Sequence, residues 1–85
     1  MQIEKISALI QAGLPDATTH IDGDGTHFTA IVISDTFEGQ SRLARHQAVN
    51  QTVSAAMLDG SLHALSLRTF TQAEWDALDY KEKWR

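Results

Sequence analysis

Four histidines carry most of the metal-binding potential of this chain, because it contains no cysteine. They are His20, His27, His46 and His63. The absence of thiols excludes disulfides, cysteine-type zinc sites and thiol nucleophiles. Imidazoles and carboxylates are therefore the only strong side-chain ligands that the chain can offer a metal.

His27 and His63 each stand near the start of a predicted strand. The stretches "HFTAIVIS" and "LHALSLRTF" are rich in strand-forming residues, and a predicted helix separates them. A crossover of this kind normally leaves two strands parallel. If the strands are neighbours, about 4.8 Å apart, both histidines lie at the same end of the sheet. Strand parity lets both rings leave one side, but the register between the strands is not fixed by the sequence.

Two imidazoles cannot complete a four-ligand site, so a metal held here would need ligands from another molecule. The alternative interpretation is that His27 is a polar turn residue after "GDGT" and that His63 is a strand residue bonded to a backbone carbonyl. Spacing alone leaves both interpretations open.

The other two histidines have simpler explanations. His20 follows two threonines in a predicted strand and is expected to be a solvent-exposed edge residue. His46 falls in the apolar stripe of a predicted helix, where a half-buried, hydrogen-bonded imidazole or a partner contact is expected. Two basic clusters accompany them: Arg42, Arg45 and His46 near the "FEGQS" turn, and Lys81, Lys83 and Arg85 in the tail.

The elements that position these residues follow from periodicity and from turn and capping signals. Asp35 with Glu38, and Thr71 with Glu74, have the spacing of capping boxes. One stripe of the long helix is predicted to comprise Arg42, His46, Val49, Val53, Ala56 and Met57. The predicted order is a helix over 3–14, strands over 17–22 and 27–34, one helical turn from 35, a helix over 41–58, a strand over 62–70 and a helix over 71–78.

Length and charge limit the possible functions. A chain of 85 residues is expected to form a single domain, 1–85, with a thin core and little room for an enclosed pocket. A net charge of -4 disfavours broad attraction to nucleic acid, although a local basic patch is compatible with it. No apolar run is long enough to span a membrane and the start lacks a secretory signal, so a cytoplasmic location is expected. No nucleophile, base and orienting group can be assembled from spacing, so we expect no enzyme activity.

Several motifs in order resemble the BolA family over nearly the whole chain. They are "FEGQSR" at 37–42, "RH" at 45–46, "HALS" at 63–66 and "TQAEW" at 71–75. The form with "GDGTHF" before the second strand is similar to the acid-stress-associated bacterial branch. The resemblance implies an α+β, KH-like fold of the second type in the order αββααβα, with helices packed on one face of a three-stranded mixed sheet.

The resemblance also implies a partner and a shared cofactor. Members of the family pair with monothiol glutaredoxins of the CGFS type and share a [2Fe-2S] cluster with them, the partner supplying a cysteine and a bound glutathione thiolate. His63 and His27 are the ligands implied on this chain. The isolated chain is expected to hold no cluster, and to be a monomer or a weak homodimer. The implied role is iron-sulfur cluster trafficking, iron homeostasis or a stress response.

A second function implied by the resemblance is transcriptional regulation through nucleic acid. KH-type folds clamp a nucleic-acid backbone with a GxxG loop. The loop in the corresponding place is "EGQS", which lacks the second glycine. The residues expected to bind nucleic acid in this alternative are Gly39, Gln40, Ser41, Arg42, Arg45 and His46.

Overall fold

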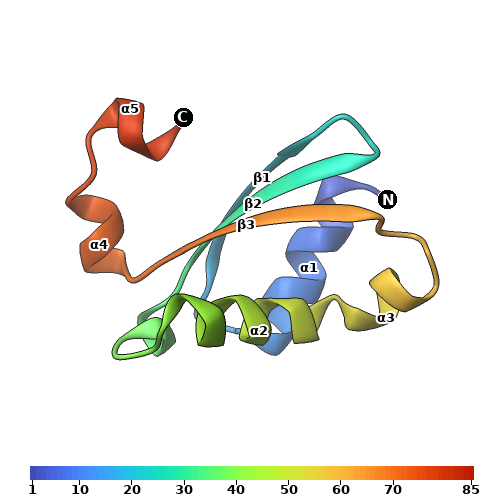
Figure 1. Cartoon of the computed structure of the whole chain (residues 1–85), viewed down its shortest axis with the longest axis horizontal. Helices are drawn as coiled ribbons and strands as arrows, with labels where there is room; N and C mark the ends of the chain where they lie inside the picture. Colours follow the sequence, from blue (N-terminus) through green and yellow to red (C-terminus); the bar gives the residue numbers. More distant parts are fainter.

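The computed structural model describes all 85 residues as a three-stranded sheet with helices on both sides (Figure 1). The strands are β1 (Thr18–Gly23), β2 (His27–Ile33) and β3 (Ala64–Phe70). The α-helices are α1 (Ile3–Gly13), α2 (Arg42–Thr52), α3 (Ser54–Leu58), α4 (Gln72–Asp76) and α5 (Tyr80–Lys83), and a 3₁₀ turn, η1, spans Asp35–Phe37. No helix is long and apolar enough to cross a bilayer.

The sheet has the order β1-β2-β3 and the predicted mixed topology. β1 and β2 form an antiparallel hairpin, in which His20 pairs with Ile31. β2 and β3 are parallel, joined by the crossover through α2 and α3. The hairpin and crossover predictions are therefore both confirmed, and β3 is left as an edge strand.

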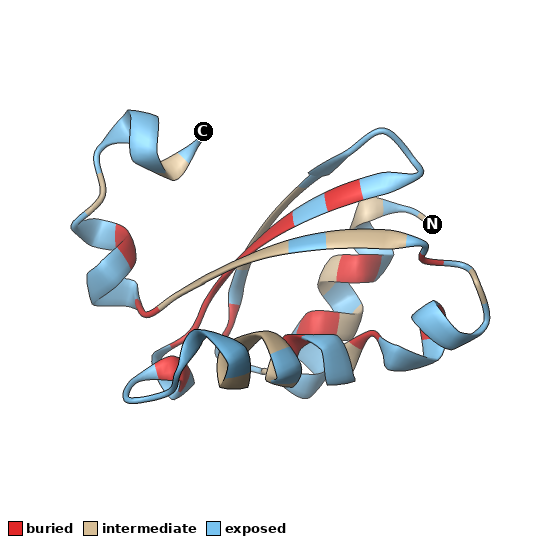
Figure 2. Ribbon diagram, in the orientation of Figure 1, coloured by how far each residue is buried: buried red, intermediate tan, exposed pale blue.

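The larger core lies on one face of the sheet, which we call the first face. Alternate residues of β2, among them Phe28, Ala30 and Val32, point to this side. They pack against buried side chains of α1, α2 and α3 (Figure 2). The helical residues in this core are Ile6, Ile10, Val49 and Ala56, and Val53, which lies between α2 and α3, belongs to the same core.

The second face of the sheet carries a smaller apolar cluster and is covered by the C-terminal segment. Ile31 and Ile33 of β2 pack there against Trp75 of α4. In Figure 1, α4 and α5 lie on the opposite side of the sheet from α1 and α2. The expectation of helices on one face holds for α1–α3, whereas the two short C-terminal helices lie over the other face.

The predicted long helix is broken at Val53 into α2 and α3. The Thr52 hydroxyl donates to the Val49 carbonyl and the Ser54 hydroxyl donates to the Gln51 carbonyl. Such side-chain bonds compete with the helical ladder and favour a bend. Of the predicted stripe, only Val49, Val53 and Ala56 are buried, while Arg42 and Met57 are exposed.

Two capping predictions differ in outcome. Thr71 and Glu74 form the predicted capping box at the start of α4. The prediction for Asp35 is wrong: Ser34 caps η1 by accepting the N–H of Thr36, and the Asp35 carboxylate instead accepts the backbone N–H of Gln72. The predicted helix over 71–78 ends at Asp76, and α5 follows as a separate helix with its own capping box between Asp79 and Glu82. That spacing is the sequence signal for α5 that the prediction missed.

Candidate functional site

His27 opens β2 and extends into solvent, with three quarters of its side-chain surface exposed. The preceding turn is organised by Asp24, whose Oδ1 accepts the backbone N–H groups of His27 at 2.8 Å and Thr26 at 2.9 Å. These two backbone hydrogen bonds, that of His27 first, lower the pKa of Asp24 below its ordinary value. The Asp24 carboxylate also lies 3.9 Å from Nδ1 of His27. The turn therefore presents the imidazole at the rim of the sheet.

His63 is also exposed and lies directly before β3. Its neighbour Leu62 is fully buried in the main core, and the Leu62 N–H donates to the Ala56 carbonyl at 3.0 Å. The turn before it uses Gly60 at φ +79°, a conformation that favours glycine. A buried leucine thus anchors the chain one residue before His63 and leaves the imidazole outside.

The structure places both histidines at the same end of neighbouring parallel strands, as predicted. The Cα partner of His27 is Ala64, one residue beyond His63. A chain step of about 3.8 Å and a strand spacing of about 4.8 Å keep the two α-carbons within roughly 9 Å of each other.

The expectation that His27 and His63 have the same strand parity, and so face the same side of the sheet, is wrong by one residue. His27 shares its face with Ile31 on the second face, whereas Leu65 lies on the first face with Phe28. His63 precedes β3, so its direction is set by the turn and not by the pleat of the strand.

The donor set at this rim fits half of a metal site. Both side chains are exposed imidazoles, and no three His, Asp or Glu side chains gather in a group that could hold a metal ion by themselves. Tetrahedral metal ions require four ligands, and iron in a [2Fe-2S] cluster accepts two imidazoles in place of two thiolates. A cluster held here would therefore need its other ligands from a second molecule.

His20 is not the solvent-exposed edge residue that the sequence suggested. Its ring stacks on Trp75, with ring centroids 5.7 Å apart, and meets Trp84 edge to face at 5.1 Å. Trp75 and Trp84 also contact each other in a T-shaped pair. His20 is therefore a packing residue that holds the C-terminal segment to the second face of the sheet.

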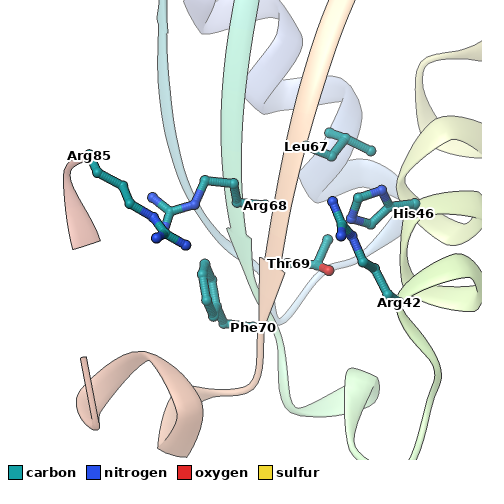
Figure 3. Close-up of a pocket in the computed structure, with 7 residues that line it drawn as sticks. All are labelled: Arg42, His46, Leu67, Arg68, Thr69, Phe70 and Arg85. Atoms are coloured by element: carbon teal, nitrogen blue, oxygen red, sulfur yellow. The ribbon is translucent and has the colours of Figure 1, made fainter. Parts of the chain in front are cut away.

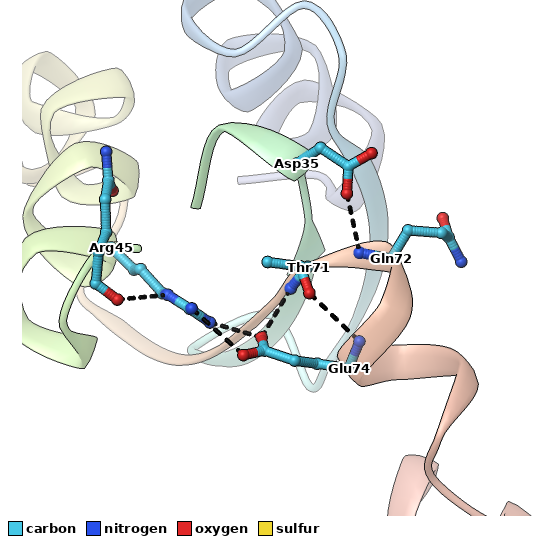
Figure 4. Close-up of polar contacts among 6 residues, drawn as sticks. Asp35, Arg45, Thr71, Gln72 and Glu74 are labelled. Atoms are coloured by element: carbon cyan, nitrogen blue, oxygen red, sulfur yellow. Dashed lines mark hydrogen bonds and ion pairs between the residues drawn. The ribbon is translucent and has the colours of Figure 1, made fainter. Parts of the chain in front are cut away.

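The basic cluster at the start of α2 divides into bound and free members. Arg45 donates to the Glu74 carboxylate and to the Gln40 carbonyl, which fixes its guanidinium in place (Figure 4). Ser41 is the N-cap of α2 and accepts the N–H of Ala44, and Gly39 adopts φ +76°. Arg42 forms no salt bridge.

His46 is half-buried, as expected from its place in the helical stripe, but its imidazole forms no hydrogen bond, so that part of the expectation is wrong. Its pKa is lowered below the ordinary value, first by burial and then by the charge of Arg42. Of the predicted nucleic-acid residues, Arg42 and His46 line one opening, while Gln40, Arg42 and Arg45 line a second opening beside it.

The fold and the motifs together define a member of a known family. The family model described as "BolA-like protein" matches residues 1–74. This chain therefore belongs to the BolA-like family. The matched region ends within α4, so most of the C-terminal segment lies beyond it.

Individual relatives support the assignment. The chain is 32% identical over 75 residues to the acid stress protein IbaG of Escherichia coli strain K12, covering 88% of this chain and 89% of that protein. It is 40% identical over 57 residues to the DNA-binding transcriptional regulator BolA of Vibrio cholerae, covering 67% of this chain and 53% of that protein. The structure of a BolA protein homologue from Coxiella burnetii superposes with a TM-score of 0.80 at 36% identity, covering 89% of this chain and 97% of that one.

Proposed function

We propose that this protein is an adaptor that pairs with a monothiol glutaredoxin of the CGFS type and shares a [2Fe-2S] cluster with it. His63 and His27 are the two ligands from this chain, and a cysteine and a glutathione thiolate are the ligands from the partner. The role that follows is in iron-sulfur cluster trafficking or iron homeostasis, in line with the stress-protein name of one relative.

One observation carries this proposal: two exposed imidazoles lie at the same end of neighbouring parallel strands. Histidines that serve only the fold are normally packed or hydrogen-bonded, as His20 is between its tryptophans. Neither His27 nor His63 donates a side-chain hydrogen bond to a backbone carbonyl, which was the alternative interpretation for His63. Their imidazole nitrogens are therefore accessible to an incoming metal centre.

The chemistry of the ligands suits a shared centre. Imidazoles replacing thiolates reduce the negative charge around the irons, and such a cluster when bound has a raised reduction potential, as in Rieske centres. On this chain, the Asp24 turn fixes the backbone of His27 and the buried Leu62 fixes the backbone of His63. The backbone of each proposed ligand is thus tied to the fold, and the partner would supply the remaining ligands.

The direct test is reconstitution. The chain is mixed with a CGFS glutaredoxin, glutathione, ferrous iron and sulfide, and the visible absorption and circular dichroism of the complex are recorded. We expect His63→Ala and His27→Ala to change or abolish the heterocomplex spectrum, and His46→Gln, a histidine away from this rim, to leave it unchanged. A wild-type spectrum from His63→Ala would reject the ligand assignment.

Nucleic-acid binding is the second candidate function. It is favoured by the unpaired Arg42 beside His46 at the start of α2 and by the name of the Vibrio cholerae relative. It is opposed by the net charge of -4 and by the commitment of Arg45 to Glu74. Titrations of single-stranded and duplex DNA at two salt concentrations test it, because phosphate contacts give an affinity that falls with salt. Affinity without such a fall, or no affinity, would remove this candidate.

A further inference from the structure

The outer edge of β3 is uncovered. β3 pairs with β2 on one side only, so its other side presents backbone groups without strand partners. An opening of about 440 Å³ runs along this edge and is lined by four consecutive strand residues, 67–70 (Figure 3). It is lined on both sides of the strand, since Leu67 and Thr69 lie on the first face and Arg68 and Phe70 on the second. The opening therefore reaches both faces of the sheet at the edge of β3.

All four arginines of this acidic chain line the opening or the smaller one that continues it. Figure 3 shows Arg42 with His46 on one side of β3, and Arg68 with Arg85 on the other. Arg45 and Arg68 are already engaged, by Glu74 and by the carbonyls of Glu82 and Lys83. Arg42 and Arg85 form no salt bridge, and no carboxylate side chain lines the larger opening.

A strand that joined β3 would place its side chains alternately toward these two sides. Residues facing the first side would meet Arg42 and His46, and residues facing the second would meet Arg68 and Arg85. Carboxylates suit both sides, because guanidinium groups bind carboxylates through charge-assisted hydrogen bonds. A cationic strand would be repelled by these arginines, and a purely apolar strand would leave their charges without partners. The arginines therefore disfavour aggregation through this edge.

We propose that the β3 edge is a docking site for an extended acidic peptide segment of a partner protein, which adds to the sheet as a fourth strand. A peptide fits better than a nucleic acid, because the row of backbone donors and acceptors on β3 matches another peptide backbone. The net charge of -4 also disfavours a polyanion more than a short acidic segment. The site lies toward the end of β3 remote from His63, so it is separate from the rim assigned to the cluster.

The probe is an acetylated and amidated peptide, Glu-Glu-Val-Val-Glu-Glu-Val, which is as long as the seven residues of β3 and carries glutamates on both of its sides when extended. Binding is followed by amide chemical shifts and by hydrogen exchange. We expect slower exchange for those amides of 67–70 that do not pair with β2. A peptide with alternate backbone nitrogens methylated cannot pair along one edge and is expected not to bind. A peptide with lysine in place of glutamate is also expected not to bind.

Protein variants test the charges. Arg42→Gln should lower the affinity for the peptide by about twofold to fivefold, which is the effect of losing one exposed ion pair. Lys5→Gln removes the same charge from α1, away from the edge, and should leave the affinity unchanged. Circular dichroism checks that both variants fold. The proposal would be overturned if the methylated peptide bound as tightly as the unmethylated one, or if the amide shifts and exchange rates of 67–70 did not change. It would also be overturned if an oligonucleotide bound more tightly and displaced the peptide. His63→Ala should bind the peptide normally, which separates this result from the fate of the cluster proposal.

Discussion

Arg45 of α2 and Glu74 of α4 are joined by a 2.6 Å contact between Nη1 and Oε1, across 29 residues of sequence (Figure 4). The same carboxylate accepts the backbone N–H of Thr71 at 2.8 Å and closes the capping box of α4. The hydrogen bond from Arg45, followed by that from the Thr71 backbone, lowers the pKa of Glu74 below its ordinary value of 4.5. One glutamate therefore connects the first-face helix α2 to the segment that crosses to the second face.

The first prediction concerns Glu74. Glu74→Ala should lower the free energy of unfolding by about 1 to 2 kcal/mol, because it removes the ion pair together with the glutamate half of the capping box, while Thr71 remains the N-cap. Glu74→Gln should lower the free energy of unfolding by less, because a glutamine side chain can still complete the capping box. Since the folded pKa is lowered, the stabilisation is full above pH 4.5 and is lost as the pH falls through the folded pKa. In urea unfolding, the stability of Glu74→Gln should therefore fall less steeply with decreasing pH than the stability of wild type.

The control for this prediction is Glu38→Gln, an exposed glutamate after η1 that forms no ion pair. It should leave both the stability and its acid dependence close to wild type. If Glu74→Gln and Glu38→Gln behaved alike across the acid range, the Arg45 ion pair would not contribute to folding.

The second prediction concerns the C-terminal helix. The Arg68 guanidinium donates to the carbonyls of Lys83 and Glu82, each at 2.7 Å, and so holds the end of α5 against β3. Arg68→Gln should speed amide exchange in α5 by about thirtyfold, because two hydrogen bonds are lost and each is worth about 1 kcal/mol locally. Global stability should change little, because α5 has no buried residue. Arg42→Gln, which removes an unpaired arginine, is the matched control, and equal exchange in both variants would contradict the assigned role of Arg68.

The sequence predicts those parts of the fold that depend on local signals or on general rules of chain connection. The hairpin, the crossover and the cap at Thr71 depend on neighbouring residues or on a general rule of handedness, and all three are confirmed. The same crossover rule correctly places His27 and His63 at one end of the sheet. Their one-residue offset was not predicted, because register depends on packing of the whole strand and not on local pattern.

The roles of His20 and Arg45 could not be predicted for a similar reason. Their own segments predict an exposed strand residue at His20 and a member of a basic cluster at Arg45. Their partners, Trp75 with Trp84 and Glu74, lie far along the chain and approach only because the C-terminal segment crosses the second face. Periodicity within a segment carries no information about such contacts.

The third prediction concerns His46. Burial, and then the charge of Arg42, lower the pKa of its imidazole below 6.5. Arg42→Gln should raise the pKa of His46 but leave it below the ordinary value, since burial is the larger cause. Arg42→Lys keeps the charge and should leave the pKa nearly unchanged. Imidazole proton shifts in an NMR titration measure this, and identical His46 titration in Arg42→Gln and wild type would exclude the charge effect.

The lowered pKa of His46 also has a stability consequence. The unfolded chain binds a proton at this position more readily than the folded protein does. The contribution of the neutral His46 to the free energy of unfolding is complete above pH 6.5 and declines as the pH falls from 6.5 through the folded pKa. His46→Gln should therefore lose less stability than wild type over this interval in urea unfolding measured at several pH values.

The last prediction compares two glycines of the hairpin that carries His27. A Cβ on Gly23 would overlap the ring of Phe28 and lie 2.6 Å from the His27 carbonyl oxygen. Phe28 is buried in the main core and cannot move freely, so Gly23→Ala should destabilise the protein by about 1 to 3 kcal/mol. Because the backbone of His27 must give way, its amide shift should also change, and reconstitution with the glutaredoxin should be less efficient.

Gly25 is the matched comparison. It has φ +96° and open space around it, so the only cost there is conformational. Asparagine tolerates positive φ better than other residues, and Gly25→Asn should cost less than about 1 kcal/mol. Urea unfolding and amide spectra of both variants separate the two causes. If Gly23→Ala were no more destabilising than Gly25→Asn, close packing at Gly23 would not be what positions His27 at the rim.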